Sequence, residues 1–210
     1  MLEMVYLNLR YLNATKFRQD ATSPKVITNV IGFSLWNGEK DYIYGALRNV
    51  QLAALYFPGW KVKIFLGKQN KNGKNVYIPD NVVKKIKVLG ADITYIDSTE
   101  VNVPKALWNV LLADESSVEN FIIRDVRHRL SRSDADVVKE WLFSGRSFHC
   151  IRDHRAQIVP EWWGANRRKL KKYLGNIEMK EFIKVTNTTS KKLPHFIMYN
   201  LREKIILLFP

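Results

Sequence analysis

The sequence predicts a three-layer α/β/α domain around a mostly parallel, mixed sheet, and three observations lead to this prediction. Apolar runs of strand length alternate along the chain with segments whose apolar residues recur every three or four positions. Capping residues, glycine or proline mark the ends of most of the helical segments. The intervals between strands are long enough for the crossover helix that parallel neighbours require. A chain of 210 residues with 46% hydrophobic content can bury one such core.

The first half of the chain predicts a βαβ unit followed by another helix and strand. Residues 26–35 predict a central strand, because the run ends in continuously apolar residues. Apolar positions from 43 to 57 recur at helical spacing and stop at a Pro-Gly pair, and residues 62–66 predict the next strand. A helix over 80–89, capped by its first aspartate, then leads to a strand over 93–96.

The second half continues the same alternation. Pro104 suits the first turn of a helix that continues through Leu111, and residues 121–124 predict a buried strand. A serine-rich capping segment precedes a helix that reaches residue 142, and residues 148–152 predict the fifth strand. We expect Cys150 to be a small core residue in that strand, and as the single cysteine it allows no intramolecular disulfide.

We divide the chain into a lead-in over 1–25, a domain over 26–184 and a tail over 185–210 to which no role is assigned. No run of about 18 uncharged apolar residues occurs, so we expect no transmembrane segment and, by default, a cytoplasmic protein. The secretory pathway stays open should a leader precede this sequence.

The chain is strongly basic, with 34 Lys and Arg residues against 20 Asp and Glu residues and a net charge of +14. Such a charge attracts anions without identifying them. Nucleic acid is the lowest-ranked partner, because the charge is scattered and no zinc-finger, RNA-binding or basic heptad motif accompanies it. Neither a Gly-x-Gly-x-x-Gly nor a Walker-type motif follows a predicted strand, which argues against dinucleotide and P-loop enzymes.

The predicted topology brings three segments that are distant in sequence to one edge of the sheet: residues 33–36, 124–129 and 152–154. Open parallel sheets bind ligands at the carboxyl ends of their strands. Two of the three segments are rich in arginine, so a phosphate-bearing ligand is expected there. The candidate binding residues are Phe33, Ser34, Trp36, Arg124, Asp125, Arg127, Arg152, Asp153 and His154.

Five blocks, in the order FSLW, LYFPGWKVKIFLG, FIIRDVRHRLS, EWLFSGRSFHCIRDH and WWG, resemble a family of small glycosyltransferase-like proteins with the GT-A nucleotide-diphosphosugar transferase fold. The resemblance covers roughly residues 26–167. It implies a protein that binds a nucleoside-diphosphate sugar and, if active, transfers the sugar to an acceptor. The alternative is a catalytically inactive module of the same fold that binds an anion or a partner.

The resemblance also implies roles for matching residues. Asp125 matches the first acid of the family's Asp-x-Asp motif, which would face a manganese or magnesium ion or the nucleotide ribose. Arg124 and Arg129 match basic residues that flank this motif. The segment from Arg152 to His154 matches a block near the acceptor or pyrophosphate, and the segment from Phe33 to Trp36 would lie beside the base and ribose.

Three departures from the family pattern bear on activity. Arg127 replaces the second acid, and a lone carboxylate beside Arg127 and Arg129 is a poor site for a hard divalent cation. Arg127 either neutralises a diphosphate directly or is a solvent-facing loop residue. Asn109 stands where the family has arginine, and the family's later segment is not recognisable past Gly164.

Other candidate residues have simpler interpretations. Asp134 and Asp136 suit the first turn of a helix, where the helix dipole favours acids. The Trp162-Trp163 pair is either a sugar-stacking platform or part of the core. Glu161 beside it is a candidate base only by position. No residue is a clear base for an acceptor hydroxyl.

Overall fold

The computed structural model describes residues 3–5, 28–68, 78–97, 101, 103–154 and 157–187. For residues 3–5, 152–154, 157–161 and 184–187 it describes the backbone alone. The predicted tail over 185–210 therefore lies mostly outside the described residues.

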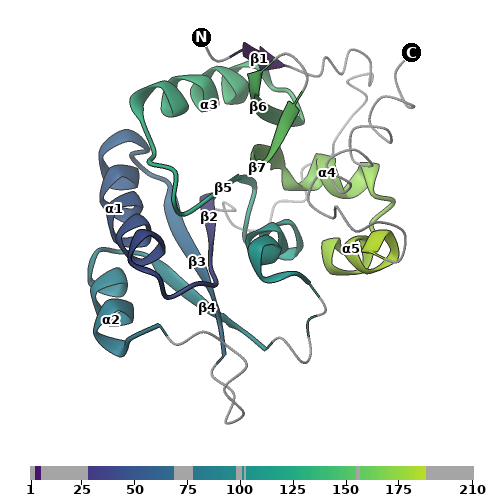
Figure 1. Ribbon diagram of the computed structural model, residues 1–210. Helices are drawn as coiled ribbons and strands as arrows, with labels where there is room; N and C mark the ends of the chain where they lie inside the picture. The colour runs from purple at the N-terminus through teal and green to yellow at the C-terminus, as the bar shows by residue number, and fades with distance from the viewer. Residues whose placement is uncertain are drawn as a thin grey trace, which may run out of the picture.

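A mixed sheet of seven strands forms the middle layer of the described part (Figure 1). Its order is β1-β6-β7-β5-β2-β3-β4. Strands β5, β2, β3 and β4 are mutually parallel, whereas β7 is antiparallel to both β5 and β6, and β1 is antiparallel to β6. The strands are β1 (Glu3–Val5), β2 (Asn29–Leu35), β3 (Lys61–Gly67), β4 (Asp92–Ile96), β5 (Asn120–Arg124), β6 (Phe148–His154) and β7 (Gln157–Asn166).

Helices cover both faces of this sheet. On one face α1, α2 and α3 pack against alternate strand residues such as Ile31 and Ile122. On the other face η1, α4 and α5 pack against Phe121 and Trp163 (Figure 1). The helices are α1 (Lys40–Tyr56), α2 (Asp80–Val88), the 3-10 helix η1 (Lys105–Asp114), α3 (Arg132–Ser144), α4 (Arg167–Tyr173) and α5 (Met179–Asn187).

This arrangement confirms the α/β class, the mostly parallel mixed sheet and all five predicted strands. Two strands were not predicted. β1 lies within the lead-in, and β7 contains the Trp162-Trp163 pair. Cys150 is buried in β6, as expected. Within the described residues, no helix has the length and apolar character needed to cross a membrane.

Glycine lets η1 lie directly on the sheet. A Cβ atom at Gly32 in β2 would meet Leu112 Cδ1 of η1 at 2.5 Å, closer than such atoms approach in folded proteins. Asn109 in η1 lies over the same part of β2. This close approach fixes the position of η1, which covers this face of the sheet near the carboxyl ends of β2 and β5.

The connections create a topological switch point between β2 and β5. From β2 the chain proceeds outward through β3 to β4, and it then returns to β5 on the other side of β2. The helices that follow β2 and β5, α1 and α3, lie on the same face of the sheet, whereas η1, which precedes β5, lies on the other face. Open α/β sheets bind ligands at such a point.

Candidate functional site

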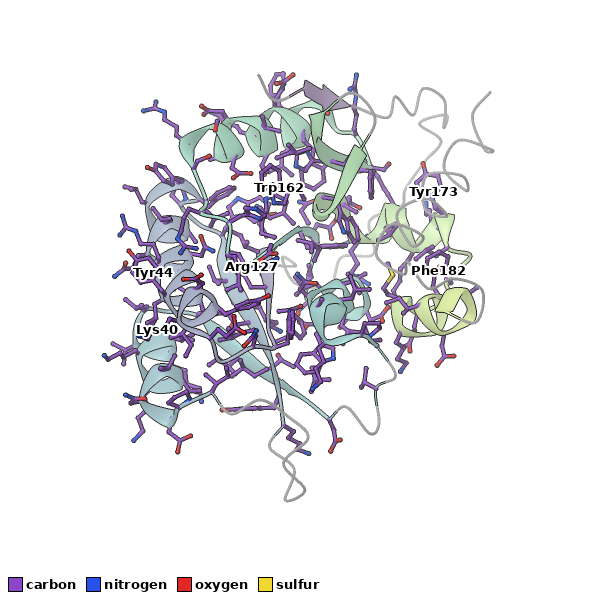
Figure 2. The ribbon with its side chains drawn as sticks, in the orientation of Figure 1. Lys40, Tyr44, Arg127, Trp162, Tyr173 and Phe182 are labelled. Atoms are coloured by element: carbon purple, nitrogen blue, oxygen red, sulfur yellow. The ribbon has the colours of Figure 1, made fainter. Side chains whose placement is uncertain are left out.

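At the switch point, four side chains form a series of contacts, each with the next. The indole of Trp36, just after β2, contacts the Tyr42 ring edge-on with 5.3 Å between ring centres. Arg127 is labelled in Figure 2, and its guanidinium carbon lies 5.1 Å from the centre of the Tyr42 ring. Arg127 Nη2 in turn donates to Asp125 Oδ2 at 2.7 Å. Aromatic and ionic groups from β2, α1 and the segment after β5 thus form one connected cluster.

Arg127 donates hydrogen bonds to both oxygens of the Asp125 carboxylate. Its backbone N–H donates to Asp125 Oδ1 at 2.7 Å, and its Nε lies 3.2 and 3.3 Å from the two carboxylate oxygens. Burial raises the pKa of the Asp125 carboxyl, but the hydrogen bonds and charge of Arg127 outweigh burial and hold this pKa below its ordinary value. The Asp125 side chain is 12% exposed and that of Arg127 is 52% exposed, so the cation faces solvent.

Asn49 of α1 holds the segment that carries this pair. Its Nδ2 donates to the carbonyls of Val126 at 2.9 Å and His128 at 2.8 Å, and its Oδ1 accepts from the Leu130 N–H at 3.0 Å. One turn earlier, a Cβ atom at Gly45 would lie 2.2 Å from the Val126 carbonyl oxygen. The segment can lie this close to α1 because position 45 is glycine.

Arg124, a predicted binding residue, is buried in the core, with its side chain 2% exposed. It donates to Asp134 Oδ1 at 3.3 Å and to the carbonyls of Ile123 at 2.9 Å and Trp163 at 3.3 Å. Asp134 is therefore the partner of a buried cation as well as a first-turn acid of α3. The arrangement ties β5 to α3 and β7, and it keeps the Arg124 side chain away from solvent.

A histidine lies beside this buried cation. His149 Nε2 is 3.5 Å from Arg124 Nη2, and its ring stacks on Trp141 with 5.5 Å between ring centres. Burial, followed by the charge of Arg124, lowers the pKa of His149 well below its ordinary value. The imidazole is therefore neutral at neutral pH and belongs to the buried network.

Two predicted residues of β2 are also buried. Phe33 is part of the core, and the Ser34 hydroxyl accepts from the Asn109 N–H at 2.9 Å. Asn109 Nδ2 lies 3.4 Å from the carbonyls of Gly32 and Arg124. Among the described residues, no group donates to Asn109 Oδ1. Asn109 thus links η1 to β2 and β5, and it leaves one buried acceptor at the switch point.

Three further predicted residues lie on β6. Both β5 and β6 are antiparallel to β7, so β6 runs in the same direction as β5 and its carboxyl end lies at the same edge of the sheet. The pairing of β6 with β7 shifts register between Cys150 and Arg152. The side chains of Arg152, Asp153 and His154, and that of Glu161, lie outside the described part of the structure.

The two adjacent tryptophans have different environments, as alternation along a strand requires. Trp163 is 1% exposed and packs against Phe121 and Phe148 in the core. Trp162 contacts the ring of His128 edge-on, with 5.1 Å between ring centres. Trp162 thus packs against the segment after β5, on the face of β7 opposite to Trp163.

The described residues bring no three His, Cys, Asp or Glu side chains close enough to hold a metal ion. Hard divalent cations take several oxygen ligands, and the carboxylate of Asp125 is already paired with Arg127. The residues of the described site therefore do not fit the manganese or magnesium ion that the family resemblance implies.

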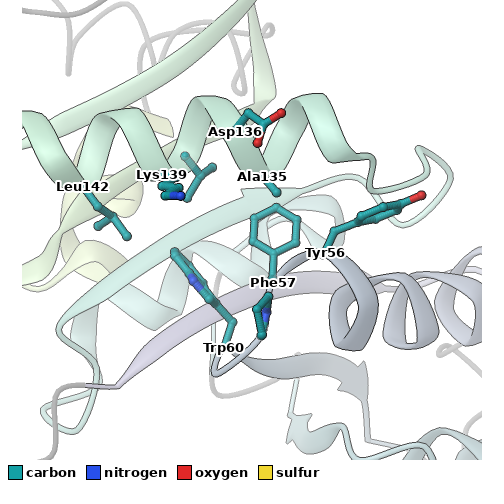
Figure 3. Close-up of a pocket in the computed structure, with 9 residues that line it drawn as sticks. Tyr56, Phe57, Trp60, Ala135, Asp136, Lys139 and Leu142 are labelled. Carbon is teal, nitrogen blue, oxygen red and sulfur yellow. The ribbon is translucent and has the colours of Figure 1, made fainter.

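A pocket of about 360 Å³ lies at the other end of α1 (Figure 3). Aromatic residues at the end of α1 and in the turn before β3 form one wall, and α3 forms the other. Tyr56 and Tyr42 are separated by fourteen residues of α1, which corresponds to about 21 Å. The pocket is thus distinct from the cluster at the switch point. Its lining residues are Tyr56, Phe57, Pro58, Trp60, Ala135, Asp136, Val138, Lys139 and Leu142.

Three residues that determine the site were not among the predicted ones. Tyr42, Gly45 and Asn49 all lie on α1 at spacings of three or four residues, so they share one face of the helix. A buried asparagine and a glycine within an otherwise apolar helical face are the signal that could have indicated a close, hydrogen-bonded neighbour.

Replacing Asn49 with alanine should loosen the segment after β5. The change leaves an N–H and two carbonyls without their partner, and each unsatisfied buried group costs about 1–3 kcal/mol. We expect the free energy of unfolding to fall by about 3 kcal/mol, with faster hydrogen exchange at the Leu130 amide. Gln51→Ala, an exposed change on the same helix, is the matched control. Equal effects of the two variants would contradict the assigned role of Asn49.

Replacing Asp134 with alanine should be more damaging than its partial exposure suggests, because the buried Arg124 guanidinium loses its carboxylate. We expect the free energy of unfolding to fall by about 3–5 kcal/mol, measured by denaturant titration. The double variant Arg124→Met/Asp134→Leu removes both charges and should recover at least about half of that loss. A double variant less stable than Asp134→Ala would show that the pair is not the source of the effect.

A search against models of protein families finds no match for this chain. A search of curated proteins also finds no significant relative. The α/β fold with its mixed sheet thus stands on the structure, whereas the glycosyltransferase-like family remains a prediction from the sequence motifs.

Proposed function

We propose that this chain has a GT-A-like fold and binds a nucleoside-diphosphate sugar at the carboxyl edge between β2 and β5, where Arg127 takes the place of a metal ion beside the diphosphate. The observation that carries the proposal is the connected cluster of Trp36, Tyr42, Asp125 and Arg127 at the switch point. Switch points are the ligand sites of open α/β sheets.

The chemistry of Arg127 supports the diphosphate assignment. A guanidinium is planar and permanently charged, and it forms the two parallel hydrogen bonds that phosphate oxygens accept. Asp125 and the Tyr42 ring fix the direction of this side chain, while 52% of its surface faces solvent. A cation held in advance of binding loses little conformational freedom when the ligand arrives.

Neighbouring groups suit the rest of the ligand. Trp36 offers a half-buried aromatic surface at the end of β2, of the kind on which a nucleobase can stack. The unsatisfied Oδ1 of Asn109 lies just beneath the same edge and needs a donor, which a ligand group or a water molecule would supply.

Sugar transfer would proceed by attack of an acceptor hydroxyl oxygen on the anomeric carbon, and the hydroxyl proton would pass to water or to an oxygen of the departing diphosphate. The bond from that carbon to the diphosphate breaks, and the leaving diphosphate takes the electron pair. A fixed positive charge beside it lowers the barrier by stabilising this developing charge. The described side chains supply that charge through Arg127. An inactive module of the same fold would use the same contacts for binding alone.

We expect uridine or guanosine diphosphate to bind with an affinity that changes less than about twofold when manganese is added. The affinity should weaken as salt screens Arg127. Arg127→Ala should weaken binding about tenfold or more, the loss of one charge-assisted contact. Titration calorimetry with and without manganese measures all three effects. Lys84→Gln, which removes one exposed charge from α2, is the matched control.

The variant Arg127→Asp tests directly whether the Arg127 guanidinium takes the place of a metal ion. It restores the second acid of the family motif, so manganese should now strengthen nucleotide binding by about tenfold or more. Strong manganese dependence of the unaltered protein would show that other acids complete a metal site and would overturn the proposal. Release of diphosphate from a nucleotide sugar then separates a transferase from a binding module.

A further inference from the structure

Three exposed arginines that the proposed nucleotide site does not use lie on α1 and in the segment that leads from β5 into α3. Arg129 follows β5, Arg48 lies on α1, and Arg132 begins α3. We call these residues, together with Tyr44, the arginine surface. All four side chains are exposed, and Tyr44 is 61% exposed.

Contacts fix the position of Arg129 within this surface. The guanidinium carbon of Arg129 lies 5.1 Å from the centre of the Tyr44 ring, and its Nη1 donates to the Arg127 carbonyl at 2.7 Å. Arg48 follows Tyr44 by one helical turn, so the two side chains share a face of α1. Arg132 comes two residues after Leu130, whose N–H is bound to the Asn49 side chain.

The charges of this surface are not balanced within the described part of the chain. There, Arg124, Arg127 and Arg168 each pair with a carboxylate, whereas Arg48, Arg129 and Arg132 form no salt bridge. The side chain of Arg48 donates to the Gln51 amide oxygen, a neutral partner. Asp41, three residues before Tyr44, is the acid nearest in sequence on this helix face.

Unbalanced charge of one sign raises the free energy of the folded state through repulsion. Binding of an anion reduces this repulsion. Arg48, Arg129 and Arg132 come from three different segments, which Asn49 and Gly45 hold in place. An arrangement of this kind has several separate anion contacts. It suits a ligand that carries more than one acidic group along its length.

An exposed aromatic ring accompanies the charges of this surface. Tyr44 lies under the guanidinium of Arg129, with 5.1 Å between the guanidinium carbon and the centre of the ring. Sugar rings present apolar faces that pack on aromatic side chains, and guanidiniums pair with carboxylate or phosphate groups. The combination of an exposed ring with several arginines therefore fits an acidic oligosaccharide.

We propose that the arginine surface binds the acceptor of the transfer reaction and that this acceptor is an acidic oligosaccharide. Its role as acceptor rests on the proposed nucleotide-sugar site, which Arg129 joins through the Arg127 carbonyl. The ligand extends from that site along α1 toward the pocket of about 360 Å³. Its acidic groups pair with Arg48, Arg129 and Arg132.

The test uses tetragalacturonic acid as the probe and its methyl ester as the uncharged form of the same saccharide. We expect the acid to bind the full-length protein, and the ester to bind at least about tenfold more weakly. Arg48→Gln/Arg132→Gln, at exposed positions, should weaken binding of the acid about tenfold or more at an unchanged melting temperature. Lys84→Gln/Lys87→Gln removes equal charge from α2 and should change it less than about twofold.

Tyr44→Ala separates the ring contact from charge alone. It should weaken binding of tetragalacturonic acid and leave binding of inorganic tripolyphosphate unchanged, since tripolyphosphate has no ring to pack. Equal losses in the arginine and lysine double variants would overturn the proposal, because net charge would then explain the binding. Tighter binding of an oligothymidylate of equal charge would also overturn it in favour of nucleic acid.

Nucleotide binding distinguishes failure of this proposal from failure of the proposed function. Uridine diphosphate should bind the Arg48→Gln/Arg132→Gln variant with unchanged affinity, because neither residue belongs to the cluster at the switch point. A protein that binds the acidic saccharide but no nucleoside diphosphate overturns the acceptor role. A protein that binds the nucleotide but distinguishes neither the acid from its ester nor the two double variants overturns the arginine surface alone.

Discussion

The hydrogen bonds of Asn49 are the constraint on which the rest of the site depends. The segment after β5 carries Asp125 and Arg127, yet it has no regular secondary structure to fix it. Two carbonyls and one N–H of this segment are bound to a single side chain of α1. Buried backbone groups need such partners, so the path of the segment, and with it the direction of Arg127, follows from one buried amide.

Two arginines that are close in sequence illustrate how differently one charge can be used. Arg124 is enclosed by Asp134 and two carbonyls, whereas Arg127 lies at the surface beside Asp125. A buried guanidinium stabilises the fold little in itself, but its removal or the loss of its partner is costly. Arg124 therefore fixes how β5, β7 and α3 meet. That geometry sets the starting point of the segment that presents Arg127.

The sequence was sufficient for most of the fold, because apolar periodicity reports which residues face a core. All five predicted strands have that pattern. It failed for β7, where Pro160 and the adjacent Trp162-Trp163 pair interrupt any alternation. It also could not separate Arg124 from Arg127, since both follow an apolar run and only the position of Asp134 on α3 decides which one is buried. Side-chain roles at strand ends depend on neighbours that are distant in the chain.

In the proposed mode of binding, the pairing of Asp125 with Arg127 takes the place of the two acids and the metal ion that the family resemblance implies. Asp-x-Asp carboxylates would repel each other without a cation between them. Here the positive charge belongs to the protein, and the same carboxylate that would hold a metal instead orients a guanidinium. Such a site is complete before any ligand binds. If the site binds a diphosphate as proposed, its affinity depends on the direction of Arg127, and Asn49 of α1 holds the backbone on either side of that residue.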